Sequence, residues 1–401
     1  LHSVNERFRL CRYRAGQQFN IHQDGVHHRA AGLQSRLTFM VYLTDGDDFE
    51  GGDTLFHSAG PAGDAAGHVR PRAGSLILFD HSLWHAGAVV TRGVKHILRS
   101  DVLYERQARV ATPAPQAFQP GHAGYVWTMA HLGEELLASG GRDAVIRLWR
   151  DDGEAAGALH GHHQSVLGLA ALPDGQLASV SRDRCLRLWD VRSRRCTREI
   201  AAHEASALTV TALPDGGIAT GGADAAVKLW HGNGDALATL NGHQGWVWAV
   251  APLGNALLAS ASEDGSVRLW ERQSGQCLHT LPGPAPLRDL LVLPGGEQLV
   301  TADVEGRLVW WQHHNGEWHR THTQRAHTAA VRRLRLVGPG QLASAGEDNR
   351  VRVWRVSGRQ LLAQSQHDNF VTDVLSLRGA YLSCSYDGQI ARHDSPAGIE
   401  P

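Results

Sequence analysis

A unit of about 40 residues recurs seven times between residues 121 and 396 of this 401-residue chain. Each complete copy has a His near its start, an Asp 20 or 21 positions later, and a Trp six positions after that Asp. A unit this short cannot bury a hydrophobic face alone, so the copies must stack on one another. The key positions, copy by copy, are His122, Asp143, Trp149; His162, Asp183, Trp189; His203, Asp224, Trp230; His243, Asp264, Trp270; Pro284, Glu305, Trp311; His327, Asp348, Trp354; and His367, Asp387, His393.

The pattern resembles the WD40 repeat, and the resemblance implies an all-β, seven-bladed β-propeller. In each complete copy we expect the His, a strand hydroxyl, the Asp and the Trp to form one buried hydrogen-bonded set, which makes these His residues structural. The blades that depart from the pattern, at Pro284, Glu305 and His393, should be the least rigid. The strand hydroxyls are those of Ser139, Ser179, Thr220, Ser260, Ser344 and Ser383.

A Pro- and Ala-rich segment precedes the repeats and predicts a domain boundary. The predicted organisation is a first domain over residues 1–106, a linker over 107–120, and a propeller over 121–396. The seventh copy ends near Asp394 after its third strand, so we expect Pro115 to Phe118 to supply a closing strand.

One face of such a propeller usually binds a partner. The residue before the first strand of a unit is aromatic in three copies, at Tyr125, Trp246 and Phe370. The residue before the turn Asp is basic at Arg142 and Arg182. Exposed aromatic groups beside charges predict a protein or peptide partner, although packing at the rim explains each residue equally well.

Residues 8–104 contain short segments of β-forming residues separated by Gly- and Asp-rich turns, which favours a curled antiparallel sheet. His22 and Asp24 are two positions apart, so on an extended strand their side chains share a face. A distant His85 would complete a set of two imidazoles and one carboxylate, the usual ligands of a non-haem Fe(II) with open positions. An isolated His-x-Asp is a weak signal, because a chain with 25 His produces some by chance.

The ordered motifs around this pair carry more weight. Residues 12–24 read Arg-Tyr-x-x-Gly-x-x-Phe-x-x-His-x-Asp, residues 51–56 read Gly-Gly-Asp-Thr-x-Phe, and residues 85–95 read His-x-Gly-x-x-Val-x-x-Gly-x-Lys. They resemble the prolyl 4-hydroxylase-like group of 2-oxoglutarate/Fe(II) dioxygenases. The resemblance implies a double-stranded β-helix (a jelly-roll, cupin-like fold) with Fe(II) held by His22, Asp24 and His85. It further implies 2-oxoglutarate and O₂ as co-substrates and ascorbate as a further cofactor.

The same resemblance assigns roles around the iron. Lys95, ten positions after His85, would pair with the far carboxylate of 2-oxoglutarate, and Tyr13 and Thr38 would help to hold this co-substrate. A core aromatic and an ordinary strand residue are equally good interpretations of Tyr13 and Thr38. His81 competes with His85 as the distal ligand, but only His85 has the Gly, Val and Lys spacing behind it. The remaining His27, His28 and His57 are predicted to lie in or beside solvated loops.

Two features depart from the group. Only 21 residues precede His22, and the chain begins without Met, so we expect a fragment or a processed form. Asp101 occupies a position where prolyl hydroxylases of this group often have a bulky aromatic residue.

Composition restricts the remaining classes. A formal net charge of −1 gives no electrostatic basis for binding nucleic acid or an acidic membrane. No apolar run reaches the length of a membrane span, and the first residues lack the charged-then-apolar layout expected of a signal peptide. Five scattered cysteines argue against a disulfide framework and favour a cytoplasmic location. The oligomeric state stays open.

Three hypotheses follow. The chain is a dioxygenase, most simply a hydroxylase of a peptidyl or protein substrate that the propeller recruits. Alternatively, it is an interaction scaffold with an inactive, truncated oxygenase domain. A third hypothesis is an oxygenase that acts on a small molecule, with the propeller serving assembly.

Overall fold

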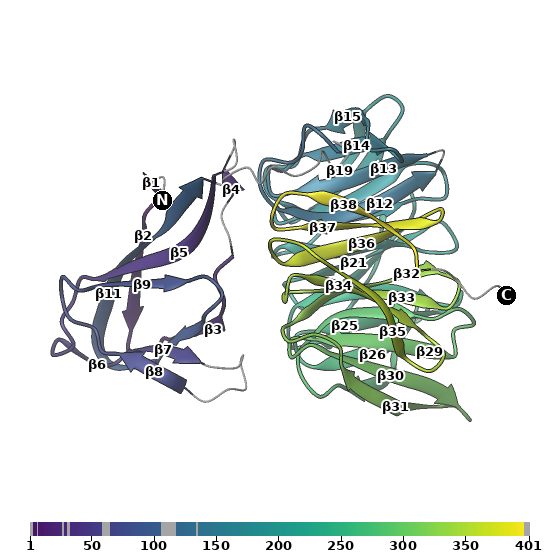
Figure 1. Ribbon diagram of the computed structural model, residues 1–401. Coiled ribbons are helices and arrows are strands. Elements are labelled where there is room, and N and C mark those ends of the chain that lie inside the picture. The colour runs from purple at the N-terminus through teal and green to yellow at the C-terminus, as the bar shows by residue number, and fades with distance from the viewer. Residues whose placement is uncertain are drawn as a thin grey trace. The chain divides into compact units, whose positions relative to one another are not determined.

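The computed structural model describes residues 3–5, 7–25, 28–29, 33–57, 65–105, 118–133 and 135–396. The regular secondary structure of these residues consists of β-strands joined by turns and loops (Figure 1). The all-β prediction is therefore confirmed. The chain divides into two compact units, Leu1–Thr112 and Pro113–Pro401. None of the described residues forms a helix long and apolar enough to span a bilayer.

The described part of unit 1 is built from two antiparallel sheets. The larger sheet has the order β1-β11-β5-β4, with β2 and β6 paired to β11 and β9 paired to β5, and the smaller sheet has the order β3-β10-β7-β8. The strands are β1 Ser3–Val4, β2 Arg9–Arg14, β3 Phe19–His22, β4 His28–Arg29, β5 Leu33–Tyr42, β6 Phe49–Gly51, β7 Thr54–His57, β8 Ala65–Val69, β9 Leu76–Asp80, β10 Trp84–Gly87 and β11 Val90–Glu105.

Strand β11 organises unit 1 because it pairs with β1, β2, β5 and β6. Its side chains alternate, so that Lys95, Ile97 and Arg99 are buried while His96 and Leu98 between them are partly exposed. Two cations therefore face the interior of the unit from one strand. A small core formed by Met40, Tyr42, Phe79 and Ile97 lies beside them.

Unit 2 consists of six four-stranded sheets and one three-stranded sheet in its described part, each formed by consecutive antiparallel strands. The strands of the first four sheets are β12 Val126–Gly133, β13 Leu136–Gly141, β14 Ile146–Arg150, β15 Ala155–Leu159; β16 Val166–Ala171, β17 Leu177–Ser181, β18 Cys185–Asp190, β19 Arg195–Ala201; β20 Ala207–Ala212, β21 Ile218–Gly222, β22 Val227–Trp230, β23 Ala236–Leu240; and β24 Val247–Leu253, β25 Leu257–Ser262, β26 Ser266–Glu271, β27 Cys277–Pro282. The other three sheets contain β28 Leu287–Val292, β29 Gln298–Asp303, β30 Arg307–His314, β31 Glu317–Arg325; β32 Val331–Gly338, β33 Gln341–Gly346, β34 Arg350–Arg355, β35 Gln360–Gln366; and β36 Val371–Leu377, β37 Ala380–Ser385, β38 Ile390–Asp394.

The seven sheets close into a ring. The first strand of each sheet contacts the first strand of the next, and β36 of the last sheet contacts β12 of the first. Hydrophobic clusters fill the spaces between neighbouring sheets, such as that of Ile146, Leu148, Val166 and Leu177. The second strands are buried on both faces, whereas outer strands such as β19 and β31 are largely exposed, which explains the radial order within each sheet.

The predicted closing strand lies mostly outside the described residues. Its last residue, Phe118, is buried against Trp149, with the ring centroids 5.5 Å apart, and its backbone N–H donates to the carbonyl of Gly153. Within the described residues, the first and last sheets are joined by the Thr372 hydroxyl, which donates to the carbonyl of Val126 at 2.6 Å.

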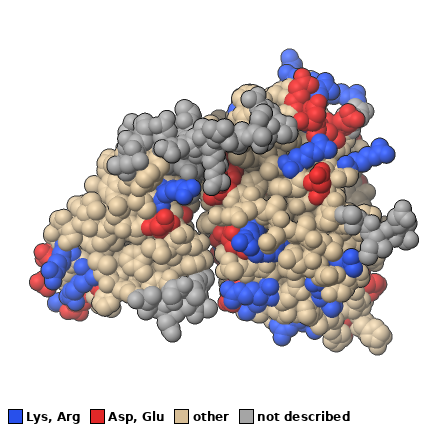
Figure 2. Space-filling model, viewed as in Figure 1, with Lys and Arg blue, Asp and Glu red and all other residues tan. Residues whose placement is uncertain are grey.

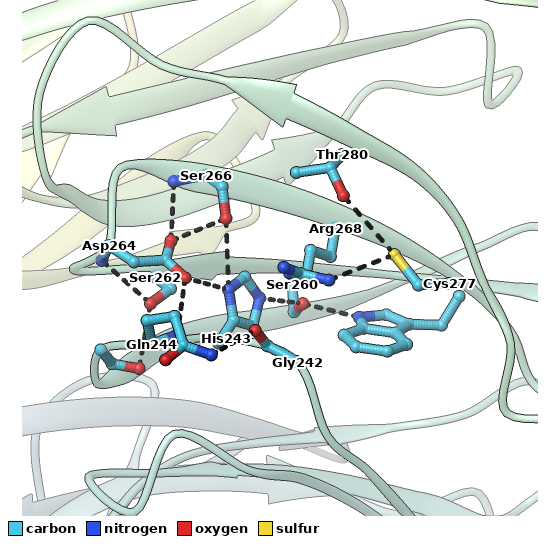
Figure 3. Close-up of polar contacts among 12 residues, drawn as sticks. Gly242, His243, Gln244, Ser260, Ser262, Asp264, Ser266, Arg268, Cys277 and Thr280 are labelled. Carbon is cyan, nitrogen blue, oxygen red and sulfur yellow. Dashed lines mark hydrogen bonds and ion pairs between the residues drawn. The ribbon is translucent and has the colours of Figure 1, made fainter.

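The predicted hydrogen-bonded set is present in all five complete repeats. In the fourth sheet, His243 Nδ1 lies 2.8 Å from Asp264, His243 Nε2 lies 2.7 Å from Ser260 Oγ, and the indole N–H of Trp270 donates to the same hydroxyl at 2.8 Å (Figure 3). Because a carboxylate accepts only, His243 donates from Nδ1 and accepts the Ser260 proton at Nε2. The set therefore links a turn to two strands without an unpaired buried atom.

The two departing repeats retain part of this set. In the seventh sheet, His393 replaces the Trp and its Nε2 lies 2.7 Å from Ser383 Oγ, so the hydroxyl keeps a ring partner. In the fifth sheet, the buried carboxylate is that of Asp303, which accepts from the backbone of Glu305 and from the Arg307 side chain. The contact within the turn that the Asp makes in the complete repeats is therefore made here by Asp303 and not by Glu305.

The buried imidazoles predict that acid destabilises unit 2. Burial lowers the pKa of His203, His243 and His327 below 6.5, the value expected in the unfolded chain. Because the unfolded chain then binds more protons below that pH, the free energy of unfolding should fall as the pH decreases through about 6.5. Urea unfolding, followed by Trp fluorescence between about pH 7.5 and about pH 5, measures this change. A constant unfolding free energy over that range would contradict the prediction.

Charged side chains of both signs occur on the visible surface of each unit (Figure 2). This distribution agrees with the near-zero formal net charge of the chain.

Candidate metal centre

Two imidazoles face each other across the smaller sheet of unit 1. His22 ends β3 and His85 lies on β10, and the two are direct partners in the antiparallel register. Their ring centroids are 4.2 Å apart. Directly opposite residues in such a pair bring their side chains together on one face, so strand pairing alone accounts for the approach. Because β3 ends at His22, Asp24 reaches the same place from the segment that follows the strand.

The backbone fixes which nitrogen of each ring is free. His22 Nδ1 lies 2.9 Å from the carbonyl of Asn20, and His85 Nδ1 lies 3.0 Å from the carbonyl of Leu83. A carbonyl only accepts, so each Nδ1 carries the proton and each Nε2 presents a lone pair. Both Nε2 atoms are buried and have no hydrogen-bond partner among the described residues. Burial also lowers the pKa of His85 to about 4, which keeps that imidazole neutral near pH 7.

The two lone pairs point toward one carboxylate. Asp24 Oδ1 lies 3.4 Å from His22 Nε2, and Asp24 Oδ2 lies 3.5 Å from His85 Nε2. Burial by itself raises the pKa of Asp24, but the charge of Arg99 and the hydrogen bond from Thr38 lower it, and the pKa lies well below its usual range. Asp24 is therefore an anion at any physiological pH.

These three side chains fit a divalent metal. One ligand atom from each of His22, Asp24 and His85 lies within 4.8 Å of the others. Two neutral imidazole nitrogens without partners and one carboxylate form the donor set that Fe(II) accepts, with further coordination positions open. The competing His81 is buried too, but it is not part of this group, and its Nε2 lies 3.7 Å from Asp101.

Lys95 is one of two lysines in the chain and is almost completely buried. Its ammonium donates to the carbonyl of Gly52 at 2.5 Å, and burial lowers its pKa to about 8. Gly52 has a φ of +71°, and a Cβ there would lie 2.9 Å from the Phe49 ring, so the close approach requires glycine. A buried cation without a carboxylate within salt-bridge distance in the described structure is suited to receive one from a ligand.

The cavity next to Lys95 also contains His85. Its lining includes Tyr13, His85, Lys95 and Arg99, and its volume of about 20 Å³ requires side chains to move before a dicarboxylate enters. The Tyr13 ring lies 6.0 Å from the Lys95 ammonium, and burial raises the pKa of Tyr13 to about 12. Lys95 and Tyr13 are direct partners across β11 and β2, which explains why they meet.

The other predicted co-substrate residue lies elsewhere. Thr38 is completely buried and donates to Asp24 Oδ2 at 2.6 Å, so it orients the carboxylate and does not line the Lys95 cavity. Arg99, which sequence reasoning missed, donates to Asp24 Oδ1 at 2.5 Å. The signal that could have identified Arg99 is its spacing of four from Lys95 on one strand, which places both on the same face.

The remaining histidine predictions have mixed outcomes. His57 ends β7 and pairs with Trp84 of β10. His28 forms part of β4, and His27 lies outside the described residues.

The five residues predicted on the propeller face fall into two groups, one that lines a cavity and one that contacts Tyr386 or Tyr125. Arg182 and Trp246 line a cavity in unit 2. Tyr125 stacks on Tyr386, with the ring centroids 4.1 Å apart, and Arg142 lies over Tyr125 at 5.0 Å. Phe370 contacts Tyr386 at 5.5 Å, and Trp246 is the most exposed of the three predicted aromatic residues.

Comparison with protein families matches both parts of the chain. Residues 8–100 match the 2OG-Fe(II) oxygenase superfamily. Five segments match the WD domain, G-beta repeat: residues 114–150, 153–190, 194–231, 234–271 and 318–355.

Curated relatives match a shorter stretch. Eukaryotic translation initiation factor 3 subunit I of Lodderomyces elongisporus is 39% identical over 69 residues, or 17% of this chain and 20% of the relative. The protein of the same description from Aspergillus terreus is 42% identical over 77 residues, or 19% of this chain and 23% of the relative. The chain thus spans about a fifth of the length of the curated relatives it matches.

Proposed function

We propose that this chain, which joins a 2OG-Fe(II) oxygenase-superfamily domain to WD40 repeats, is an Fe(II)- and 2-oxoglutarate-dependent dioxygenase that hydroxylates a peptidyl or protein substrate recruited by the propeller. The observation that carries the proposal is the convergence of the unpartnered His22 and His85 Nε2 atoms on the Asp24 carboxylate.

The residues of unit 1 have separate roles in this proposal. His22, Asp24 and His85 would hold the metal, and Lys95 would bind the far carboxylate of 2-oxoglutarate. When bound, Fe(II) with 2-oxoglutarate and O₂ supplies the oxidising chemistry for a C–H bond. Thr38 orients Asp24 through its hydrogen bond, and the rings of Phe19 and Phe79 contact His22 and His85, whose Nε2 atoms are buried.

An interaction scaffold without turnover is the second candidate function. The observation that favours it is the Arg99 guanidinium on Asp24 Oδ1, because a cation at this carboxylate competes with a metal ion. A carboxylate offers about four lone-pair positions, so the contacts from Arg99 and Thr38 still leave room for a metal.

An anaerobic titration distinguishes the two functions. Fe(II) is added to the protein without O₂, followed by 2-oxoglutarate, and the visible spectrum is recorded. The dioxygenase predicts a weak charge-transfer band that appears only with both additions, followed by succinate formation when O₂ is admitted. Absence of the band and of succinate would favour the scaffold.

Replacing Lys95 with alanine should weaken co-substrate binding and spare the metal. Because a charge-assisted contact contributes more than a neutral one, we expect the half-saturating concentration of 2-oxoglutarate to rise at least about tenfold. Fe(II) affinity, measured separately by equilibrium dialysis, should change little. Lys228→Ala, which removes the other lysine of the chain, is the matched control. An unchanged 2-oxoglutarate requirement in Lys95→Ala would exclude Lys95 from the site.

A further inference from the structure

Every sheet of unit 2 has a β-bulge at the same place. The pairing of the first strand with the second shifts register after the first residue, in all seven sheets. A bulge leaves one residue unpaired and redirects its side chain. The seven residues at these positions all line one cavity of about 510 Å³: Trp127, Leu167, Leu208, Trp248, Arg288, Arg332 and Thr372.

The cavity presents hydrogen-bond donors that have no acceptor. Trp127 Nε1, Trp248 Nε1 and Arg288 Nε are buried and lack a hydrogen-bond partner within the described structure. The Trp residues of the repeat motif behave differently, since indoles such as that of Trp270 donate to a strand hydroxyl. Trp and Arg side chains cannot accept hydrogen bonds. These three groups therefore require an acceptor from a ligand or from solvent.

The cavity lining includes one arginine without an ion pair in the described structure. Arg332 pairs with Glu347 at 2.7 Å, and Arg333 lies 3.3 Å from Asp373 and 3.7 Å from Asp289. Arg288 lies 3.9 Å from Glu263, a longer contact. Arg182 lines the same cavity and has no ion pair with a carboxylate among the described residues. Its guanidinium is therefore open to a negative charge on a ligand.

Aromatic surface surrounds these donors. Arg288 lies over the ring of Trp248 at 4.3 Å, and Trp248 contacts Trp246 at 5.6 Å. Trp246 is 46% exposed, an unusual fraction for so large an apolar side chain. Burial lowers the pKa of Arg288, so an anion in the cavity would also relieve the cost of keeping this cation there. A volume of about 510 Å³ is typical of ligand cavities.

We propose that this cavity binds the carboxylate of an Asp or Glu side chain of a protein partner, with an apolar residue of the same segment packed on Trp246. A single carboxylate matches both the Arg182 guanidinium, which has no ion pair in the described structure, and the donor set. A peptide fits better than a small anion because the exposed Trp246 extends the apolar surface beyond the charged groups. The proposal deepens the recruitment step of the proposed function and rests on it for its purpose.

The test measures binding of the full chain, without Fe(II) or 2-oxoglutarate, to immobilised heptapeptide pools. The central residue is fixed as Glu, Gln or phosphoserine, and the other positions are randomised. We expect retention on the Glu pool to exceed that on the Gln pool about tenfold. Since turnover is not measured, an inactive oxygenase would not affect the result, and failure here would leave the titration of the metal centre standing.

Two variants and one control localise the binding. Arg182→Gln, at an exposed side chain, should abolish the preference for Glu, and Trp248→Phe, which keeps a ring but removes the N–H, should weaken retention several-fold. Arg320→Gln, at an exposed arginine on the outer strand β31, should leave binding unchanged. Equal retention on the Glu and Gln pools, retention on the phosphoserine pool alone, no retention on any pool, or an unchanged preference in Arg182→Gln would each overturn the proposal.

Discussion

Replacing His85 with alanine is expected to abolish the conversion of 2-oxoglutarate to succinate and to lower Fe(II) affinity more than about 100-fold. Loss of groups that only orient a metal ligand already costs roughly 10- to 100-fold, so loss of a ligand itself should cost more. The effect is large because His85 supplies one of two neutral Nε2 lone pairs beside Asp24. Succinate formation without added substrate and equilibrium dialysis of Fe(II) measure the two quantities.

His81→Ala is the matched control for this experiment. His81 is four residues away and is 4% exposed where His85 is 2% exposed, and within the described structure neither of its ring nitrogens has a hydrogen-bond partner. Both substitutions therefore remove a buried imidazole, and circular dichroism should show similar folding. Only His85→Ala should lose the metal. Loss of Fe(II) binding in both variants, or in His81→Ala alone, would contradict the ligand assignment.

The second large effect is expected in unit 2, where Ser260→Ala should lower the free energy of unfolding by about 2–4 kcal/mol. The hydroxyl of Ser260 accepts from the Trp270 indole and donates to His243 Nε2, and all three side chains are buried. Alanine leaves both ring nitrogens unpaired away from water. Urea unfolding followed by Trp fluorescence is suitable because eleven of the twelve Trp residues, all except Trp84, lie in unit 2.

Two comparisons test the mechanism of this loss. Ser274→Ala changes an exposed hydroxyl near the same sheet and should alter stability by no more than about 0.5 kcal/mol. Thr301→Val removes the corresponding hydroxyl of the fifth sheet, where Pro284 replaces the His and only the Trp311 indole is left unpaired. Its effect should be smaller than that of Ser260→Ala. Equal losses in all three variants would show that the hydrogen-bonded set has no special role.

The repeat made most of unit 2 predictable. Its period predicts consecutive sheets, and the spacing of His, Asp and Trp predicts contacts such as His243 to Asp264 because these residues are brought together by a turn within one unit. The breaks in the pattern were harder to interpret. His393 makes the contact with Ser383 that a Trp makes in the complete repeats, and Asp303, not Glu305, accepts the hydrogen bonds of the turn in the fifth sheet.

The candidate metal centre was predictable in composition but less so in arrangement. The spacing of His22 and Asp24 together with the family resemblance identified His22, Asp24, His85 and Lys95, and the structure brings the first three together. Sequence reasoning did not identify Arg99 as a partner of Asp24, and it assigned Thr38 to the co-substrate although Thr38 contacts Asp24. These contacts join residues 14 and 75 positions apart, so they depend on which strands pair.

The sequence by itself determined the all-β class and the repeats with their hydrogen-bonded sets, because both follow from periodicity along the chain. The resemblance of its motifs to a known family identified the residue types of the candidate metal centre. Only the tertiary structure decided that His22 and His85 are cross-strand partners, and that seven bulged residues meet in one cavity. The physical reason is that the side chains of an extended strand alternate with a period of two. This period determines neither the register between distant strands nor the position of a bulge.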